Sequence, residues 1–189
     1  MVDENYGKWV TLKEEMNACK GCSFQSGERL LGSGNKDAHI MIVTDRPEPE
    51  ESDEDGFAGE QGQTLKKYLR LINITPESVY KTSLVCCKNG GKLQKESVTS
   101  CLTCLRNQFR LVRPEIVVCV GKLTACTLIE PDFNLSRRHG EIVGKGKTMF
   151  IAVKSPLAVK YDKNLNKELL SDFMKLYDFC KTYPPAVSG

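Results

Sequence analysis

The chain contains 189 residues with a formal net charge of +3, which fits a single domain spanning residues 1–189. Its 40% apolar and 27% charged residues exclude disordered and collagen-like classes, and no stretch approaches the ~18 apolar residues of a membrane span. Met1–Trp9 lacks the apolar segment of a secretory signal, so we expect a cytoplasmic protein with reduced cysteines.

Strand and helix patterns alternate along the chain. Short apolar runs rich in β-branched residues predict four strands, His39–Thr44, Val79–Val85, Glu115–Val120 and Thr148–Val153. Apolar residues at helical spacing predict four helices, Gln63–Ile72, Glu96–Val112, Gly121–Ile129 and Lys167–Lys181. This alternation predicts an α/β fold, a three-layer α/β/α sandwich around a central four-stranded, mostly parallel sheet.

The functional site is expected at one edge of this sheet, because ligands of parallel sheets bind beyond the carboxyl ends of the strands. The segments that follow the four predicted strands are Thr44–Glu48, Cys86–Asn89, Gly121–Lys122 and Lys154–Lys160. We expect the site to be assembled from them.

The charge is divided unevenly along the chain. Six acidic residues fall within Glu48–Asp55, and without them the rest of the chain carries +9. A basic body with one acidic loop favours an anionic partner such as nucleic acid, although an ordinary soluble surface with one solvated loop has the same composition.

Nine cysteines are more than packing requires. Three of them lie in apolar or amphipathic patterns and are predicted to be buried thiols: Cys119, Cys126 and Cys180. Cys19-Lys-Gly-Cys22 has the CxxC spacing with which two thiolates bind one metal or cluster. Cys101-Leu-Thr-Cys104 would complete a four-thiolate zinc site, whereas Cys87 and Cys101, with thirteen residues between them, would complete an iron–sulfur site. Spacing alone does not decide between them.

Six short motifs follow one another between Cys19 and Tyr177. They are Gly32-Ser-Gly34, Met41-Ile-Val-Thr-Asp-Arg-Pro47, Phe57-Ala-Gly-Glu-Gln-Gly-Gln63, Gln108 with Pro114-Glu-Ile-Val117 and Gly121, Arg138-His-Gly140, and Ala152-Val-Lys-Ser-Pro-Leu157. In order and spacing they resemble the family 4 uracil-DNA glycosylases of the uracil-DNA glycosylase superfamily. The resemblance implies a [4Fe-4S] cluster held by Cys19, Cys22, Cys87 and Cys101, with Cys86 and Cys104 as alternative ligands.

The resemblance also implies a monomeric glycosylase that acts on a flipped base in duplex or single-stranded DNA. Asp45 occupies the position of the family's catalytic Glu and would orient water and stabilise the sugar cation, with Glu48 and Glu51 as nearby alternatives. Phe57 matches the base-stacking aromatic, and Leu157 would fill the vacated stack. Basic residues near the site are expected to contact phosphates: Lys145, Lys147, Lys154, Lys160, Arg137 and Arg138.

Several positions depart from the family's pattern. Ser83 replaces the Asn that reads uracil's edge, Ser155 replaces the His that steadies the leaving base, and Arg46 and Glu48 replace a small Ala and Gly. These changes predict a larger or differently substituted base, such as a modified cytosine, in place of plain uracil. Because cytosine derivatives leave poorly as anions, we expect a group to stabilise or protonate the departing base, the candidates being Arg46, Glu48, Lys154 and His139.

The leading hypothesis is therefore a DNA glycosylase with altered base specificity, and a hypermodified phage cytosine as its substrate would place it in anti-phage defence. Other classes stay open at this point. They are an ordinary uracil-DNA glycosylase of base-excision repair, a catalytically inactive DNA-binding module, and a zinc-bound interaction domain.

Overall fold

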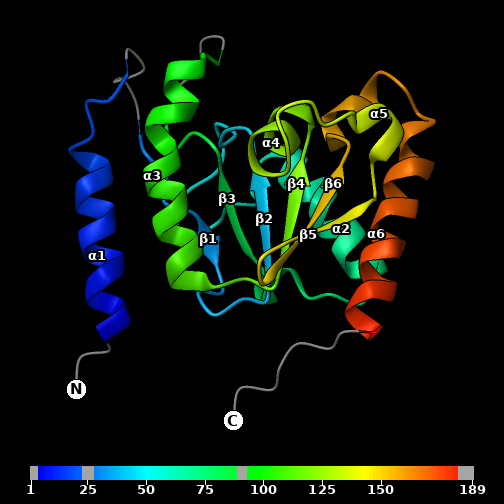
Figure 1. Ribbon diagram of the computed structural model, residues 1–189, viewed down its shortest axis with the longest axis horizontal. Helices are drawn as coiled ribbons and strands as arrows, with labels where there is room; N and C mark the ends of the chain where they lie inside the picture. Colours follow the sequence, from blue (N-terminus) through cyan, green and yellow to red (C-terminus); the bar gives the residue numbers. More distant parts are fainter. Residues whose placement is uncertain (1–3, 23–27, 89–92, 183–189) are drawn as a thin grey trace.

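The fold is built on a mixed sheet with helices on both faces (Figure 1). A computed structural model describes residues 4–22, 28–88 and 93–182. Within them the strand order is β1-β3-β2-β4-β6-β5. The parallel centre consists of β3 (Tyr80–Ser83), β2 (Ile40–Thr44), β4 (Ile116–Val120) and β6 (Thr148–Val153), and the antiparallel edges are β1 (Ser33–Gly34) and β5 (Ile142–Lys145).

The four predicted strands are confirmed as the parallel centre, and the three-layer prediction is confirmed with them. The sheet has six strands in the described residues, and not the four predicted. The two additional strands lie at the edges, where β1 contains only two residues and β5 is half exposed. Edge strands of this kind lack the continuous apolar run that marks a strand buried on both faces.

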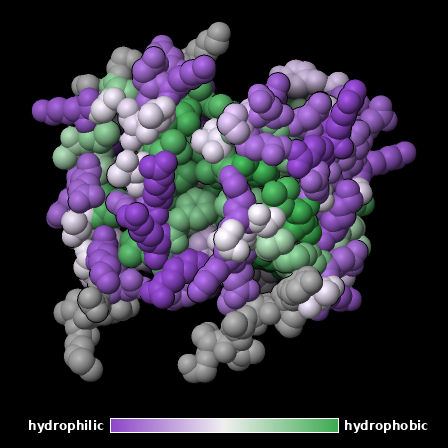
Figure 2. All heavy atoms as spheres, in the orientation of Figure 1, coloured by the Kyte–Doolittle hydropathy of each residue, from purple (hydrophilic) through white to green (hydrophobic). Residues whose placement is uncertain are grey.

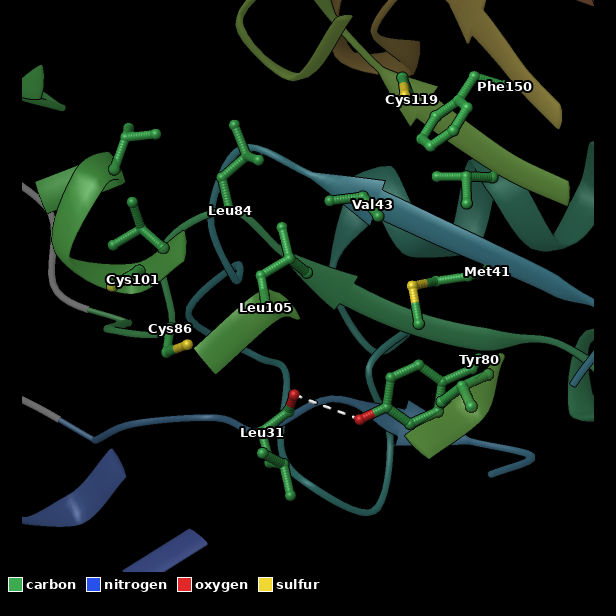
Figure 3. Packing of buried hydrophobic residues seen from close by; sticks show 14 of the residues in the cluster. Leu31, Met41, Val43, Tyr80, Leu84, Cys86, Cys101, Leu105, Cys119 and Phe150 are labelled. Atoms are coloured by element: carbon green, nitrogen blue, oxygen red, sulfur yellow. Dashed lines mark hydrogen bonds between the residues drawn. The ribbon is translucent and has the colours of Figure 1, made fainter. Parts of the chain in front are cut away.

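Two cores fill the space between the layers. On one face the sheet packs against α1 (Glu4–Asn17), α3 (Lys95–Val112) and α4 (Lys122–Leu128). Figure 3 shows part of this core, where Met41, Val43, Tyr80 and Leu105 lie close together. On the other face it packs against α2 (Glu60–Leu71) and α6 (Leu165–Thr182).

The four predicted helices are confirmed, whereas α1 and the short helix α5 (Leu135–Arg138) were not predicted. Helix α3 ends as expected before Pro114, with Arg113 in the left-handed region at φ 54°. Helix α1 was not predicted, because it buries only a narrow stripe of three apolar residues, Trp9, Leu12 and Met16, among polar ones.

The remaining elements are short. Helix α5 (Leu135–Arg138) and the 3₁₀ turns η1 (Pro76–Ser78) and η2 (Pro156–Lys160) connect the main elements. None of the described helices has the length and apolar character needed to cross a bilayer.

Candidate active site

The four predicted segments follow the carboxyl ends of the parallel strands, and these ends lie together at one end of the sheet, as expected. Thr44 at the end of β2 pairs with Ser83 at the end of β3, and Asp45 and Leu84 continue these strands. The next two segments begin with Gly121 after β4 and Lys154 after β6. Asn89, the last residue of the predicted segment after β3, lies outside the described residues.

Asp45 directly follows the central strand β2, and its carboxylate is held in place by hydrogen bonding. Its Oδ1 accepts a hydrogen bond from Thr124 Oγ1 at 2.9 Å, and its backbone carbonyl accepts one from the Val85 amide at 3.2 Å. Gly121, at φ +93°, begins the turn into α4 beside the carboxylate, and a Cβ there would lie 3.6 Å from Oδ1. The strand and the helix therefore hold one half-buried carboxylate in a defined orientation.

Burial raises the pKa of Asp45 above its ordinary value, because a carboxylate loses hydration when it leaves water. The hydrogen bond from Thr124 and the positive charge of Arg46 oppose that rise. Sequence reasoning identified Asp45 and Arg46 but not Thr124, which lies 79 residues from Asp45 in the chain.

Glu48 holds the start of helix α2. Its two carboxylate oxygens accept hydrogen bonds from the backbone amides of Gln61, at 3.0 Å, and Gly62, at 3.2 Å. These amides have no partner within the helix, and negative charge is favourable at a helix N-terminus. The contact gives Glu48 a structural role, and its catalytic role stays a prediction.

Ser155 and Ser83 both use their hydroxyl groups within the protein. Ser155 Oγ accepts a hydrogen bond from Gln61 Nε2 at 3.1 Å, which joins α2 to the segment after β6. Ser83 is buried, and its Oγ donates to the Val85 carbonyl at 2.9 Å. Neither position offers the amide or imidazole group that the resemblance would require there. Gln61 was not singled out from the sequence, although it lies within the third motif.

Phe57 is part of the core beside α2, with 4% of its surface exposed. Its backbone packs on Gly62, where a Cβ would come within 2.5 Å of the Phe57 Cα. The Nζ atoms of Lys66 and Lys81 lie 5.6 and 5.9 Å from the ring centroid. The ring thus lies in a fixed position beside two ammonium groups, and its base-stacking role stays a prediction.

A buried ion pair that sequence reasoning missed lies beside Phe57. Lys81 Nζ donates to Glu51 Oε1 at 2.6 Å, with 1% and 5% of the two side chains exposed. Burial lowers the pKa of Lys81 and raises that of Glu51, while their mutual attraction opposes both shifts. The sequence offers Glu51 as an alternative to Asp45 or as a residue of a solvated acidic loop, and the structure buries it. The available signal was a lysine between Tyr80 and Thr82 in a predicted strand.

His139 contacts two acidic residues of helix α6 and forms a polar network with them. Its Nδ1 lies 2.8 Å from Asp172 Oδ1, its Nε2 lies 3.4 Å from Glu168 Oε2, and Glu168 also pairs with Lys154. Burial raises the pKa of the fully buried Asp172, and the contact with His139 opposes the rise. The network connects α6 to the segment after β6, next to Ser155.

The residues predicted to contact phosphate differ in their surroundings. Arg138 pairs with Glu130 and Glu141, and Lys160 pairs with Glu60. Lys145 Nζ donates to the carbonyls of Leu128 and Ile129. Arg137 and Lys147 are exposed, and Leu157 in η2 is half-buried. Tyr161, directly after η2, is 91% exposed and was not singled out from the sequence.

Five of the cysteines surround a cavity of about 210 Å³ between α1 and α3: Cys19, Cys86, Cys87, Cys101 and Cys104. Ser100 Oγ donates to the Gly21 carbonyl at 2.7 Å, and Arg29 donates to the carbonyls of Asn17 and Cys19. The CxxC segment is therefore held against α3.

The donor chemistry of this cavity suits a thiolate-bound metal or cluster. A hydrogen bond from Cys86 lowers the pKa of Cys101 to about 6, which favours the thiolate that binds metal. Burial, together with Cys101 and Cys22 nearby, raises the pKa of Cys87. Cys86 Sγ lies 3.6 Å from Cys104 Sγ. Within the described residues, however, no three His, Cys, Asp or Glu side chains are already arranged around one ion position.

A separate groove of about 850 Å³ lies at the opposite end of the sheet, where β4 and β6 begin. Its lining includes Phe109, Arg113, Met149 and Phe179. Figure 2 shows apolar side chains gathered in a hollow between α3 and the β5–β6 hairpin, surrounded by polar residues. The groove is remote from Asp45 and contributes nothing to the candidate site.

Comparison with known proteins gives one consistent result. A family model described as the uracil DNA glycosylase superfamily matches residues 31–176. The chain is 30% identical to a type-4 uracil-DNA glycosylase of Archaeoglobus fulgidus, covering 92% of this chain and 94% of the relative. It is also 24% identical to the type-4 enzyme of Saccharolobus solfataricus, over 92% and 87% of the two chains, and 27% identical to that of Sulfurisphaera tokodaii, over 90% and 84%.

Proposed function

The chain belongs to the uracil-DNA glycosylase superfamily, and we propose that it is a DNA glycosylase that flips a modified base out of DNA and hydrolyses its N-glycosidic bond. The observation that carries the proposal is the fixed, half-buried carboxylate of Asp45 at the carboxyl ends of the parallel strands. The relatives that share this chain's length are named uracil-DNA glycosylases, which supports the same reaction class.

The reaction breaks the bond between the sugar C1′ and the base nitrogen, whose electron pair leaves with the base. Positive charge then develops on the sugar, and a water oxygen forms the new bond to C1′ while its proton passes to a carboxylate or to solvent. Asp45 would stabilise the cation and orient that water. The hydrogen bond from Thr124 keeps the carboxylate in place, so little reorganisation is needed when the charge develops.

We propose a modified pyrimidine, and not plain uracil, as the base that is removed. Support comes from Ser83 and Ser155, whose hydroxyl groups bond to Val85 and Gln61 inside the protein. The candidates to stabilise or protonate the departing base are Arg46, Glu48, Lys154 and His139. A hypermodified cytosine of phage DNA would fit this description and would assign the protein to anti-phage defence.

DNA would be held by basic side chains near the carboxyl ends of the parallel strands. Arg137, Arg138, Lys154 and Lys160 are the proposed phosphate contacts, and Leu157 would enter the stack that the base leaves. Since three of these four cations pair with carboxylates in the free protein, phosphates would have to replace those partners.

We propose that a [4Fe-4S] cluster binds at the α1–α3 cavity through Cys19, Cys87 and Cys101, which line it, and through Cys22, which follows Cys19 in the CxxC segment. When bound, the cluster would supply a covalent connection between the CxxC segment, the residues after β3 and helix α3. Ser100 and Arg29 already hold these segments together. A brown protein containing iron and acid-labile sulfide would support this assignment, whereas a colourless protein containing zinc would support the four-thiolate alternative.

The decisive experiment incubates the purified protein with duplexes that contain uracil, hypoxanthine or one of several modified cytosines, followed by alkali to cleave abasic sites. Strand cleavage at a modified cytosine and not at uracil supports the full proposal. Cleavage at uracil alone would identify an ordinary uracil-DNA glycosylase. Binding without cleavage of any duplex would identify an inactive DNA-binding module.

The biological role requires a separate test. Hosts with and without the gene are challenged with phage that carry modified or unmodified cytosine. Protection against only the modified phage supports anti-phage defence, and equal survival of both phages contradicts it.

A further inference from the structure

The proposed reaction does not use the ion pair between Lys81 and Glu51. Lys81 Nζ lies 2.6 Å from Glu51 Oε1, and the lysine side chain is 1% exposed. An ammonium group carries three N–H donors. Among the described residues, Glu51 is the one hydrogen-bond acceptor for Lys81, so two donors of a buried cation have no acceptor. Such donors are costly to bury unless something else accepts from them.

The pair lies on the α2 face of the sheet, the face that also carries Phe57. Side chains alternate along a strand, so Lys81 and Ser83 point to the same face of β3. Ser83 ends that strand next to Thr44, one residue from Asp45. Glu51 belongs to the loop between Asp45 and Phe57, and the Phe57 ring centroid is 5.9 Å from Lys81 Nζ.

Packing alone does not explain a lysine at this position. Lys81 is paired in register with Ile42, and its neighbours on the same face of the sheet include the apolar residues Ile40, Val118 and Val120. Replacing a buried ion pair by apolar residues of similar volume is often neutral or stabilising. A residue that lowers stability without a packing benefit is expected mainly where function requires it.

We propose that Lys81 and Glu51 together read the hydrogen-bonding edge of the flipped base. The inference rests on the proposed glycosylase function and specifies its substrate. Glu51 would accept from an exocyclic amino group, as carboxylates do with cytosine N4, and Lys81 would donate to the ring nitrogen or carbonyl beside it. The pair therefore selects a 4-aminopyrimidine, a cytosine-type base.

The positive charge of Lys81 has a second consequence for the same base. When the glycosidic bond breaks, the electron pair moves onto the base, and an ammonium group at its edge stabilises the negative charge. This contribution matters most for a cytosine-type base, which is a poor anionic leaving group.

The test compares a double variant with a matched control. Lys81→Met with Glu51→Leu removes both charges together, so that neither partner is left buried and unpaired, and it is expected to fold. The control is Lys13→Met, which breaks the pair between Lys13 and Asp53 that ties the same loop to helix α1. Single-turnover excision is measured on duplexes with uracil, cytosine and 5-hydroxymethylcytosine, and thermal unfolding confirms that each variant is folded.

We expect the double variant to lose about tenfold or more in the ratio of cytosine-type to uracil excision, with the ratio unchanged in Lys13→Met. An unchanged ratio in a folded double variant, or an equal change in the control, would overturn the role of the pair while the glycosylase function stood. If the parent excises no base, the proposed function fails. The pair is then tested by binding to duplexes with a hydrolysis-resistant 2′-fluoro nucleotide, where a base preference that persists in the double variant overturns it.

Discussion

Asp45 Oδ1 and Thr124 Oγ1 form a 2.9 Å hydrogen bond that connects the end of β2 to helix α4. This contact fixes the orientation of the one carboxylate that the proposed mechanism places beneath the sugar. We expect Asp45→Asn to lower the rate of abasic-site formation by about 10²–10⁴-fold, because the amide carries no charge to stabilise the cation. Affinity for DNA, measured by fluorescence anisotropy, should stay within about twofold of the parent. Undiminished excision would remove Asp45 from the mechanism.

The hydroxyl group of Thr124 also has a predicted effect on pH dependence. Its hydrogen bond opposes the rise that burial causes in the pKa of Asp45, so Thr124→Val should raise that pKa further. Because the reaction needs the ionised carboxylate, activity disappears as the pH falls through this pKa. The acid limb of the pH–rate profile should therefore move to higher pH in Thr124→Val. The matched control is Thr127→Val on the same helix, whose hydroxyl donates to the Leu123 carbonyl, and an equal movement there would contradict the prediction.

Glu48 should contribute to stability through the first turn of α2. Glu48→Ala removes the acceptor for the amides of Gln61 and Gly62, and we expect it to lower the free energy of unfolding by about 1 kcal/mol. Urea denaturation measures the change. Glu50→Ala, an exposed position in the same loop, should stay within about 0.5 kcal/mol of the parent. Loss of excision by a fully folded Glu48→Ala would instead support the catalytic role.

Replacing a proposed cluster ligand and replacing another cysteine should have different effects on the metal content of the protein. Cys101→Ser should lose most of its iron, because the proposed cluster then lacks one of four ligands. Cys104→Ser, whose sulfur contacts Cys86, should keep it, as should Cys180→Ser on α6. Iron, sulfide and zinc are measured per chain after anaerobic purification. If Cys104→Ser lost its iron and Cys101→Ser kept it, Cys104 and not Cys101 would be the ligand. Zinc in the parent protein would favour the four-thiolate zinc site.

The contact between His139 and Asp172 predicts a pH-dependent loss of stability. Burial raises the pKa of Asp172 in the folded state, so its contribution is favourable below the unfolded pKa and is lost as pH rises through the folded pKa. His139→Phe removes the partner that keeps this pKa from rising further. We therefore expect it to cost about 1–3 kcal/mol at about pH 7 and clearly less at about pH 4.

Urea denaturation at both pH values measures the difference. His39→Phe is the control, because His39 lies 3.6 Å from Glu115 in an exposed pair and should change stability little. A cost of His139→Phe that is independent of pH would show that Asp172 does not cause it.

The parts of the fold that could be predicted are those with a strong local pattern. Strand β4 is buried on both faces and reads as the uninterrupted apolar run Ile116–Val120, and Pro114 marks the end of α3. Helix α1 and strand β5 could not be predicted, since each places few apolar residues inward and depends on the neighbouring element for its stability.

For the candidate site, the positions were predictable but their partners were not. Asp45 and Ser155 follow strand ends and Ser83 lies within a predicted strand, and the sequence pattern locates all three. Their contacts with Thr124 and Gln61 join residues far apart in the chain and depend on how helices pack on the sheet. The ion pair of Lys81 also needed the structure, because a single lysine in a strand does not reveal whether its side chain finds a carboxylate.

Strand β3 carries Ser83 and Lys81 near one end of the sheet and continues directly into Cys86 and Cys87. Three residues of extended chain span only about 10 Å, so one short backbone segment connects the sulfur-rich cavity to the side chains that we propose contact the base. Oxidative damage to the thiols should therefore also weaken the discrimination between bases that we propose for Lys81 and Glu51. If the cysteines hold the proposed cluster, iron starvation of the host would produce a less selective protein as well as a less stable one.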